Sequence, residues 1–148
     1  MRGFKLVSKY QNQNINLPER SSVGSAGYDF EAASDVTIKA HQSEPVLIPT
    51  GIKAYMESNE FLLLVNRSGN PRKKGLILPN GVGIVDSDYF DNPGNEGEIF
   101  FQVLNIKDED VTIKKGERIG QGIFMPFLMA ENDLADGKRI GGFGSSGD

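Results

Sequence analysis

The segment NGVGIVDSDY, from Asn80 to Tyr89, combines residue types that can bind a flat polar molecule. Its turn-forming Asn and two glycines predict a tight β-hairpin whose backbone approaches a ligand closely. Asp86 follows this turn, and a carboxylate held at a strand end can deprotonate a water molecule. Asp88 shares its face if the strand continues, so it is a second candidate base. The alternative interpretation is an ordinary hairpin with a solvated Asp86 and with Tyr89 packed at a strand edge.

Arg67, Ser68 and Gly69 form a second set of candidate residues, suited to phosphate. The arginine supplies a fixed cation, and the serine hydroxyl and the glycine backbone supply close hydrogen-bond donors. Further basic residues cluster at 72–74 and at 138–139. The ordinary interpretation of such charge runs is a solvated loop.

Residues 137–148 form a tail rich in Gly and Ser, which is predicted to be a flexible arm beyond a folded region of residues 1–136. Its backbone N–H groups and hydroxyls can surround phosphate oxygens, and Phe143 can stack on a base. The alternative is that GSSG is an artificial linker, although an aromatic residue between glycines is less usual there.

Composition narrows the classes of function. The chain has 148 residues, 38% of them hydrophobic, which suits one domain. The absence of cysteine excludes disulfides and thiolate chemistry, and the single His41 excludes a histidine metal cluster. A net charge of −4 argues against a nucleic-acid surface. The longest apolar run, at 61–65, is too short for a membrane, and no signal peptide is visible, so we expect a soluble cytoplasmic protein.

The polar and apolar residues alternate with a period of two in most of the chain, which predicts strands at residues 36–40, 52–56, 111–113 and 123–127. The segments EFLLLVN and EIFFQVLNI are apolar on both faces, as in the middle of a sandwich or at a subunit contact. The best helical candidate is a short piece from Ala130 to Ala135. This pattern predicts an all-β fold, a distorted jelly roll or β-barrel.

Five motifs occur in a fixed order along the chain: AGYDF at 26–30, NRSG at 66–69, GVGIVDSDY at 81–89, KGERIGQGIF at 115–124 and GGFGSSG at 141–147. Together they resemble the trimeric deoxyuridine triphosphate nucleotidohydrolases, the dUTPases, over nearly the whole chain. The resemblance implies hydrolysis of dUTP to dUMP and pyrophosphate. Asp86 would be the base that activates water for attack on the α-phosphorus, and Asp29 would support the metal and the base indirectly.

The physical properties of the third motif agree with the substrate that the resemblance implies. The flat ring of Tyr89 can pack under a sugar and leave no room for a 2′-hydroxyl, which favours deoxyribose. The fixed donors and acceptors of the hairpin backbone, together with the Asn80 amide, match the edge of uracil. Cytosine reverses two of those groups and leaves buried partners unpaired, whereas thymine carries a methyl group that a close hairpin excludes.

The resemblance also implies the ligands of the site. Mg²⁺ would be bound mainly through substrate phosphates and water, with no direct protein ligand. The assembly would be a homotrimer with shared active sites, closed by the arm. The implied substrate-binding residues are Arg67, Ser68, Gly69, Asn80, Gly83, Ile84, Val85, Tyr89, Phe100, Gln121, Lys138, Arg139, Phe143, Gly144, Ser145 and Ser146.

The chain departs from the family pattern at two places. An insertion, residues 90–96, follows Tyr89 and replaces an arginine, as in dUTPases of phages and Gram-positive bacteria. In the fifth motif, Lys138 occupies the usual arginine position and Arg139 follows it, so either cation can reach phosphate. Two alternatives stay open: a dCTP deaminase, which shares the fold, and a phage-type regulator that binds a repressor protein, with the insertion as a contact.

Overall fold

The computed structural model describes residues 1–142, and its regular structure is almost entirely β-strand. The predicted contacts of Phe143, Gly144, Ser145 and Ser146 lie outside the described residues. The strands are β1 (Gly3–Leu6), β2 (Tyr28–Glu31), β3 (Val36–Ile38), β4 (Val46–Pro49), β5 (Ile52–Tyr55), β6 (Glu60–Val65), β7 (Leu76–Ile77), β8 (Gly83–Asp86), β9 (Phe100–Asn105), β10 (Val111–Ile113) and β11 (Arg118–Pro126). Three short helical turns accompany them: η1 (Ser8–Tyr10), η2 (Asn70–Lys74) and η3 (Ser87–Tyr89).

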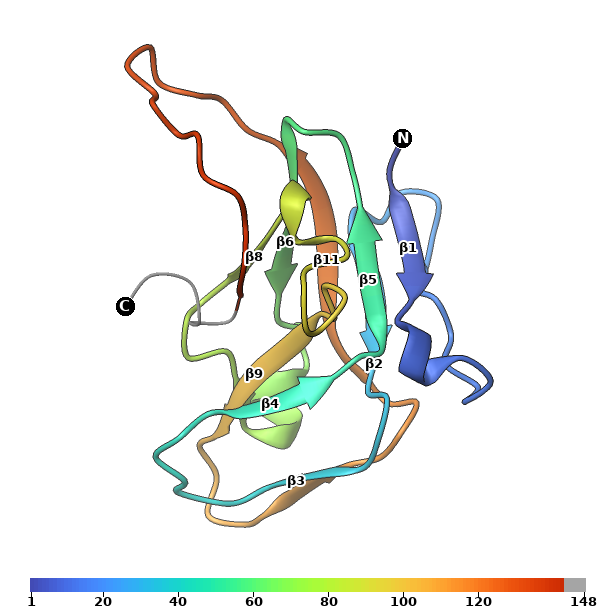
Figure 1. Cartoon of the computed structure of the whole chain (residues 1–148). Helices are drawn as coiled ribbons and strands as arrows, with labels where there is room; N and C mark the ends of the chain where they lie inside the picture. The colour runs from blue at the N-terminus through green and yellow to red at the C-terminus, as the bar shows by residue number, and fades with distance from the viewer. Residues whose placement is uncertain (143–148) are drawn as a thin grey trace.

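The strands pair antiparallel in four small sheets. The largest has the order β2-β11-β6-β8, and the others are β4-β9-β7, β1-β5 and β10-β3. Figure 1 shows β1 and β5 along one side of the molecule, with β3 and β4 at the end away from the N-terminus. The segment after β11 leaves the barrel and returns beside β8 (Figure 1). The predicted all-β jelly-roll fold is confirmed.

The core follows from the alternation of side chains along each strand. In β6, Leu62 and Leu64 point inward and are buried, while Phe61 and Leu63 are partly exposed. Phe30 of β2 is fully buried, and glycine in β11 makes room for it: a Cβ atom on Gly122 would lie 2.9 Å from the Phe30 ring. Small residues in β11 therefore let the large rings of the core close against it.

Two predictions about local structure are wrong. Residues 80–83 do not join a hairpin, because β7 pairs with β9 whereas β8 pairs with β6. The turn instead connects strands of two different sheets. Ala130–Ala135 is not a helix but a turn, in which the Asp133 amide donates to the Ala130 carbonyl at 3.1 Å. No helix within residues 1–142 is long and apolar enough to cross a membrane.

Candidate functional site

The first cavity, which we call the Asp86 cavity, has a volume of about 400 Å³ and lies beside β8 and β9. The structure gathers in its lining the candidate general base, Asp86, and six residues that were predicted to bind substrate: Asn80, Gly83, Ile84, Val85, Tyr89 and Phe100. Leu64, Leu78 and Gln102 also line it and were not predicted, because the sequence does not reveal which strands border β8. The cavity therefore combines apolar walls with a few polar groups, as binding sites for small ligands do.

Asp86 and Tyr89 are held differently although they are close in sequence. Strand β8 ends at Asp86, whose side chain is half-exposed, and η3 then turns the chain so that Tyr89 is buried. The Tyr89 hydroxyl donates to the Glu98 carbonyl at 2.6 Å. Burial raises the pKa of Tyr89 to about 12, so the phenol is neutral at physiological pH. The cavity thus presents an accessible carboxylate next to a fixed neutral ring.

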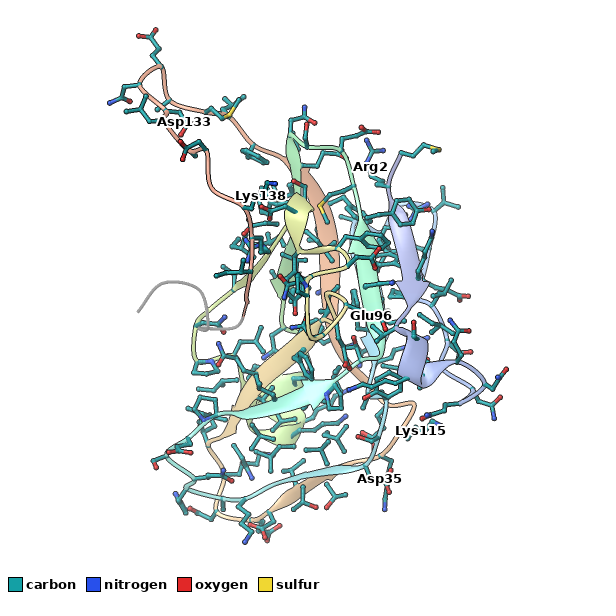
Figure 2. The ribbon with its side chains drawn as sticks, viewed as in Figure 1. Arg2, Asp35, Glu96, Lys115, Asp133 and Lys138 are labelled. Atoms are coloured by element: carbon teal, nitrogen blue, oxygen red, sulfur yellow. The ribbon has the colours of Figure 1, made fainter. Side chains whose placement is uncertain are left out.

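Arg139 covers these groups from the segment that returns after β11. Its guanidinium donates to Asp88 Oδ1 at 2.7 Å and also to Asp86, and its central carbon lies 5.8 Å from the centroid of the Tyr89 ring. The hydrogen bond to Asp88 is the main reason that the pKa of Arg139 is raised. Lys138, labelled in Figure 2 on the same returning segment, is exposed. Of the two predicted cations, Arg139 is therefore the one that lines the Asp86 cavity.

The second cavity, which we call the Arg67 cavity, has a volume of about 500 Å³. Its lining includes the residues predicted to contact phosphate or to support the site: Asp29, Arg67, Ser68, Gly69 and Gln121. They come from different elements, because Arg67 to Gly69 follow β6 while Gln121 belongs to β11 and Asp29 to β2. The pairing of β11 with both neighbours brings them together, with Gln121 opposite both Asp29 and Val65.

Hydrogen bonds and ion pairs fix the orientation of these side chains. Gln121 Nε2 donates to the Asn66 carbonyl at 3.1 Å. A Cβ atom on Gly27 would lie 2.1 Å from Gln121 Oε1. Any residue other than glycine at position 27 would therefore displace the Gln121 amide. Asp29, which is mostly buried, lies 3.5 Å from Arg67 Nε and therefore contacts the candidate phosphate cation directly.

Lys73 is a lining residue that the sequence assigned to a solvated basic cluster. The five-residue π-helical turn η2 brings it back over Gly69, with the Lys73 amide donating to the Gly69 carbonyl at 2.9 Å. A Cβ atom on Gly69 would lie 3.5 Å from Lys73 Cδ and 4.0 Å from its Nζ. Its neighbour Lys74 pairs with Glu117 at 3.0 Å. The sequence carries no signal for this placement, because a turn of five residues is too short to show a helical period.

The two cavities share no lining residue within residues 1–142. Asp86 is opposite Phe61, whereas Arg67 follows the other end of β6. At about 3.3 Å per residue, the six steps from Phe61 to Arg67 span roughly 20 Å along the backbone. The candidate base and the candidate phosphate cation therefore belong to different cavities of one chain.

Comparisons with known proteins agree with the motifs. The family model described as dUTPase matches residues 13–147. The deoxyuridine 5′-triphosphate nucleotidohydrolase of Lactococcus lactis subsp. lactis (strain IL1403) is 55% identical over 149 residues, which cover 99% of this chain and 98% of that protein. The crystal structure of dUTPase from Streptococcus mutans superposes with a TM-score of 0.83 at 49% identity, covering 88% of this chain and 99% of that one.

A more distant structure shares the fold. A dUTPase variant from phage phi11 of S. aureus, whose structure shows the coordination of a structural Mg(II) ion, superposes with a TM-score of 0.71 at 20% identity. The alignment covers 93% of this chain and 97% of that one. At this identity the similarity extends to the arrangement of the strands.

Proposed function

The chain belongs to the dUTPase family, and from this premise we propose that it hydrolyses dUTP to dUMP and pyrophosphate, with Asp86 activating the water that attacks the α-phosphorus. The observation that carries the proposal is the Asp86 cavity, in which a half-exposed carboxylate lies beside a buried tyrosine ring. A carboxylate at a rigid strand end can orient a water molecule and accept its proton.

Substrate selection follows from the walls of the same cavity. The β8 backbone and the Asn80 amide offer donors and acceptors to the uracil edge, and Leu64 and Leu78 provide the apolar wall. The Tyr89 ring would exclude a 2′-hydroxyl from a sugar bound against it. Cytosine would leave buried partners unpaired, and such a loss costs more than a poor apolar fit.

Arg139 has a role both in the protein without substrate and in the complex with a nucleotide. In the structure it forms ion pairs with both Asp86 and Asp88. The phosphates of an incoming nucleotide compete for the guanidinium, because arginine binds phosphate through paired hydrogen bonds. When Arg139 moves to phosphate, the Asp86 carboxylate is released for its role as a base. Lys138 then remains a peripheral cation.

The separation of the two cavities supports a homotrimer with shared sites. The Asp86 cavity of one subunit would face the Arg67 cavity of another, so that base and phosphate ligands meet across the interface. The segment after β11 carries strongly exposed apolar side chains, Leu128 at 97% and Leu134 at 90%. Exposed apolar residues in one segment are typical of a surface that another chain covers. We expect the arm, residues 137–148, to close the assembled site.

Mg²⁺ is the expected cofactor, and the donor set suits an ion that arrives with the substrate. Within residues 1–142 no three Asp, Glu or His side chains lie close enough together to hold a metal. Phosphate oxygens and water would provide most ligands, and Asp29, which lines the Arg67 cavity, would accept a hydrogen bond from such a water. When bound, the ion would neutralise charge on the departing pyrophosphate.

A nucleotide panel tests the proposal. Pyrophosphate release should be fast with dUTP and Mg²⁺ and much slower with dCTP, dTTP and UTP. Asp86→Asn serves as the inactive control on the same panel. Ammonia release from dCTP without pyrophosphate would contradict the proposal and indicate a deaminase instead.

A further inference from the structure

The insertion after Tyr89, residues 90–96, is firmly attached to the body of the protein. Lys53 Nζ, on a side chain only 12% exposed, donates to the Asp91 carboxylate and, at 3.2 Å, to that of Glu96. Glu96, labelled in Figure 2, also accepts from the amide and the hydroxyl of Ser8 at 3.2 and 2.9 Å. The loop is therefore held in place from two other segments of the chain.

Asn95 lies inside this loop with its amide orientation fixed. Its Oδ1 accepts from the Gly97 amide at 2.9 Å and from Asn92 Nδ2 at 3.1 Å. The oxygen is thus occupied, so the NH₂ group faces the other way and donates to the Tyr89 hydroxyl at 3.1 Å. The phenol hydroxyl accepts from Asn95 and donates to the carbonyl of Glu98, two residues beyond the insertion.

The backbone of the insertion also closes on Tyr89. Gly97 has a φ of +80°, and a Cβ atom there would lie 2.2 Å from the Tyr89 carbonyl oxygen. The main-chain N–H of Asn92 donates to that same carbonyl at 3.1 Å. The loop therefore holds Tyr89 at both ends, at its main-chain carbonyl and at its hydroxyl. A small shift of the loop would move the ring in the cavity.

Resting on the proposed dUTPase activity, we propose that Asn95 is a positioning residue that fixes the Tyr89 ring beneath the sugar and so sets the preference for deoxyribose over ribose. The ring can exclude a 2′-hydroxyl only if it cannot move away from the sugar. The groups that hold the side chain on the face opposite the sugar determine whether it can move. Burial raises the pKa of Tyr89 to about 12, so the hydroxyl keeps the proton that it donates to Glu98. The insertion then acts on specificity without touching the substrate.

The test compares dUTP with UTP in Asn95→Asp, which keeps an oxygen for Gly97 and Asn92 but loses the donor to Tyr89. The ratio of kcat/KM for dUTP to that for UTP should fall about tenfold, mainly because UTP is accepted better. Pro93→Ala, at the exposed tip of the same loop, is the matched control and should leave the ratio unchanged.

A double-mutant comparison separates positioning from general loosening. Tyr89→Phe removes the hydroxyl, so it should lower the ratio by itself, and adding Asn95→Asp should lower it no further. This comparison also keeps the inference testable if Asn95→Asp folds poorly in the wild-type background, since Tyr89→Phe alone must then lower the ratio.

Two results would overturn the inference alone: a wild-type ratio in Asn95→Asp, or a further equal fall when Asn95→Asp is added to Tyr89→Phe. A wild-type protein that releases no pyrophosphate from dUTP would overturn the proposed function as well. Thermal unfolding measured on each variant confirms that the kinetics belong to folded protein.

Discussion

At the scale of single residues, the charge of the Arg67 cavity depends on which of its cations are already paired. Arg67 lies 3.5 Å from Asp29, and Lys74 is paired with Glu117. Within residues 1–142, Lys73 makes no ion pair, and its stem runs over Gly69. Its ammonium is therefore the cation in this cavity most available to a phosphate chain.

We predict that Lys73→Ala raises the KM for dUTP about tenfold, because a hydrogen bond to a charged group is lost. Lys73→Arg should retain most of the affinity. Arg72→Ala is the matched control, since Arg72 belongs to the same turn η2 but does not line the cavity. Steady-state kinetics on the three variants checks the prediction, and an equal loss in Arg72→Ala would show that general charge, not position, matters.

Tyr89 gives a prediction for the pH dependence of stability. Burial raises its pKa in the folded protein from 10.0 to about 12, so the folded state favours the neutral phenol. The resulting stabilisation is complete below pH 10.0 and is lost as the pH rises through about 12. Tyr89→Phe should therefore lose less unfolding free energy than the wild type between pH 9 and pH 11 (roughly the range over which an exposed phenol titrates). Urea unfolding at both pH values measures the difference; parallel losses would contradict the burial effect.

At the scale of elements, β11 and the loop before β2 cooperate to place Gln121. The place of its amide depends on Gly27, where a Cβ atom would collide with Oε1. We predict that Gly27→Ala displaces Gln121 and lowers kcat/KM for dUTP about tenfold, with little loss of stability because the end of a flexible side chain can move. Gly24→Ala, where a Cβ atom meets nothing within 4 Å, is the control. Equal activity of the two variants would show that Gln121 is not needed in this position.

The strands themselves could be predicted because alternation along a strand is a local property. Val36–Ile38, Ile52–Tyr55 and Val111–Ile113 all lie in strands, as the period of two indicates. Strand pairing is not a local property, and the hairpin predicted at residues 80–83 is wrong for that reason. Strand β8 pairs with β6, and both η2 and β7 lie between these two strands in the sequence.

The candidate site, too, could be predicted from the sequence only in part. The motifs contain many of the residues that line the two cavities, because each motif contributes neighbouring residues to one place. Lys73 was missed because a turn of five residues is too short to show a helical period. That the two groups of residues line separate cavities depends on the register of β6 against β8, which the sequence does not reveal.

At the scale of the whole molecule, the proposed shared site predicts that inactive variants complement one another. Asp86→Asn and Arg67→Ala should each be nearly inactive. If Asp86 and Arg67 of different subunits form one site, random mixing by co-refolding should restore about one quarter of wild-type activity, because each site draws its two halves from separate chains. If the whole site lay within one chain, mixing would restore no activity. Wild-type protein refolded in the same way is the control for activity lost during refolding.

The proposed chemistry depends on Asp86 more than on any other residue, since its carboxylate is the proposed general base and lines the Asp86 cavity. The most direct measurement is pyrophosphate release from dUTP by Asp86→Asn, with dUTP binding measured in parallel and Asp88→Asn as the control. We predict that turnover by Asp86→Asn falls by about 10²–10⁴ while binding is retained, and that Asp88→Asn keeps most of its turnover. Wild-type turnover by Asp86→Asn would contradict the account.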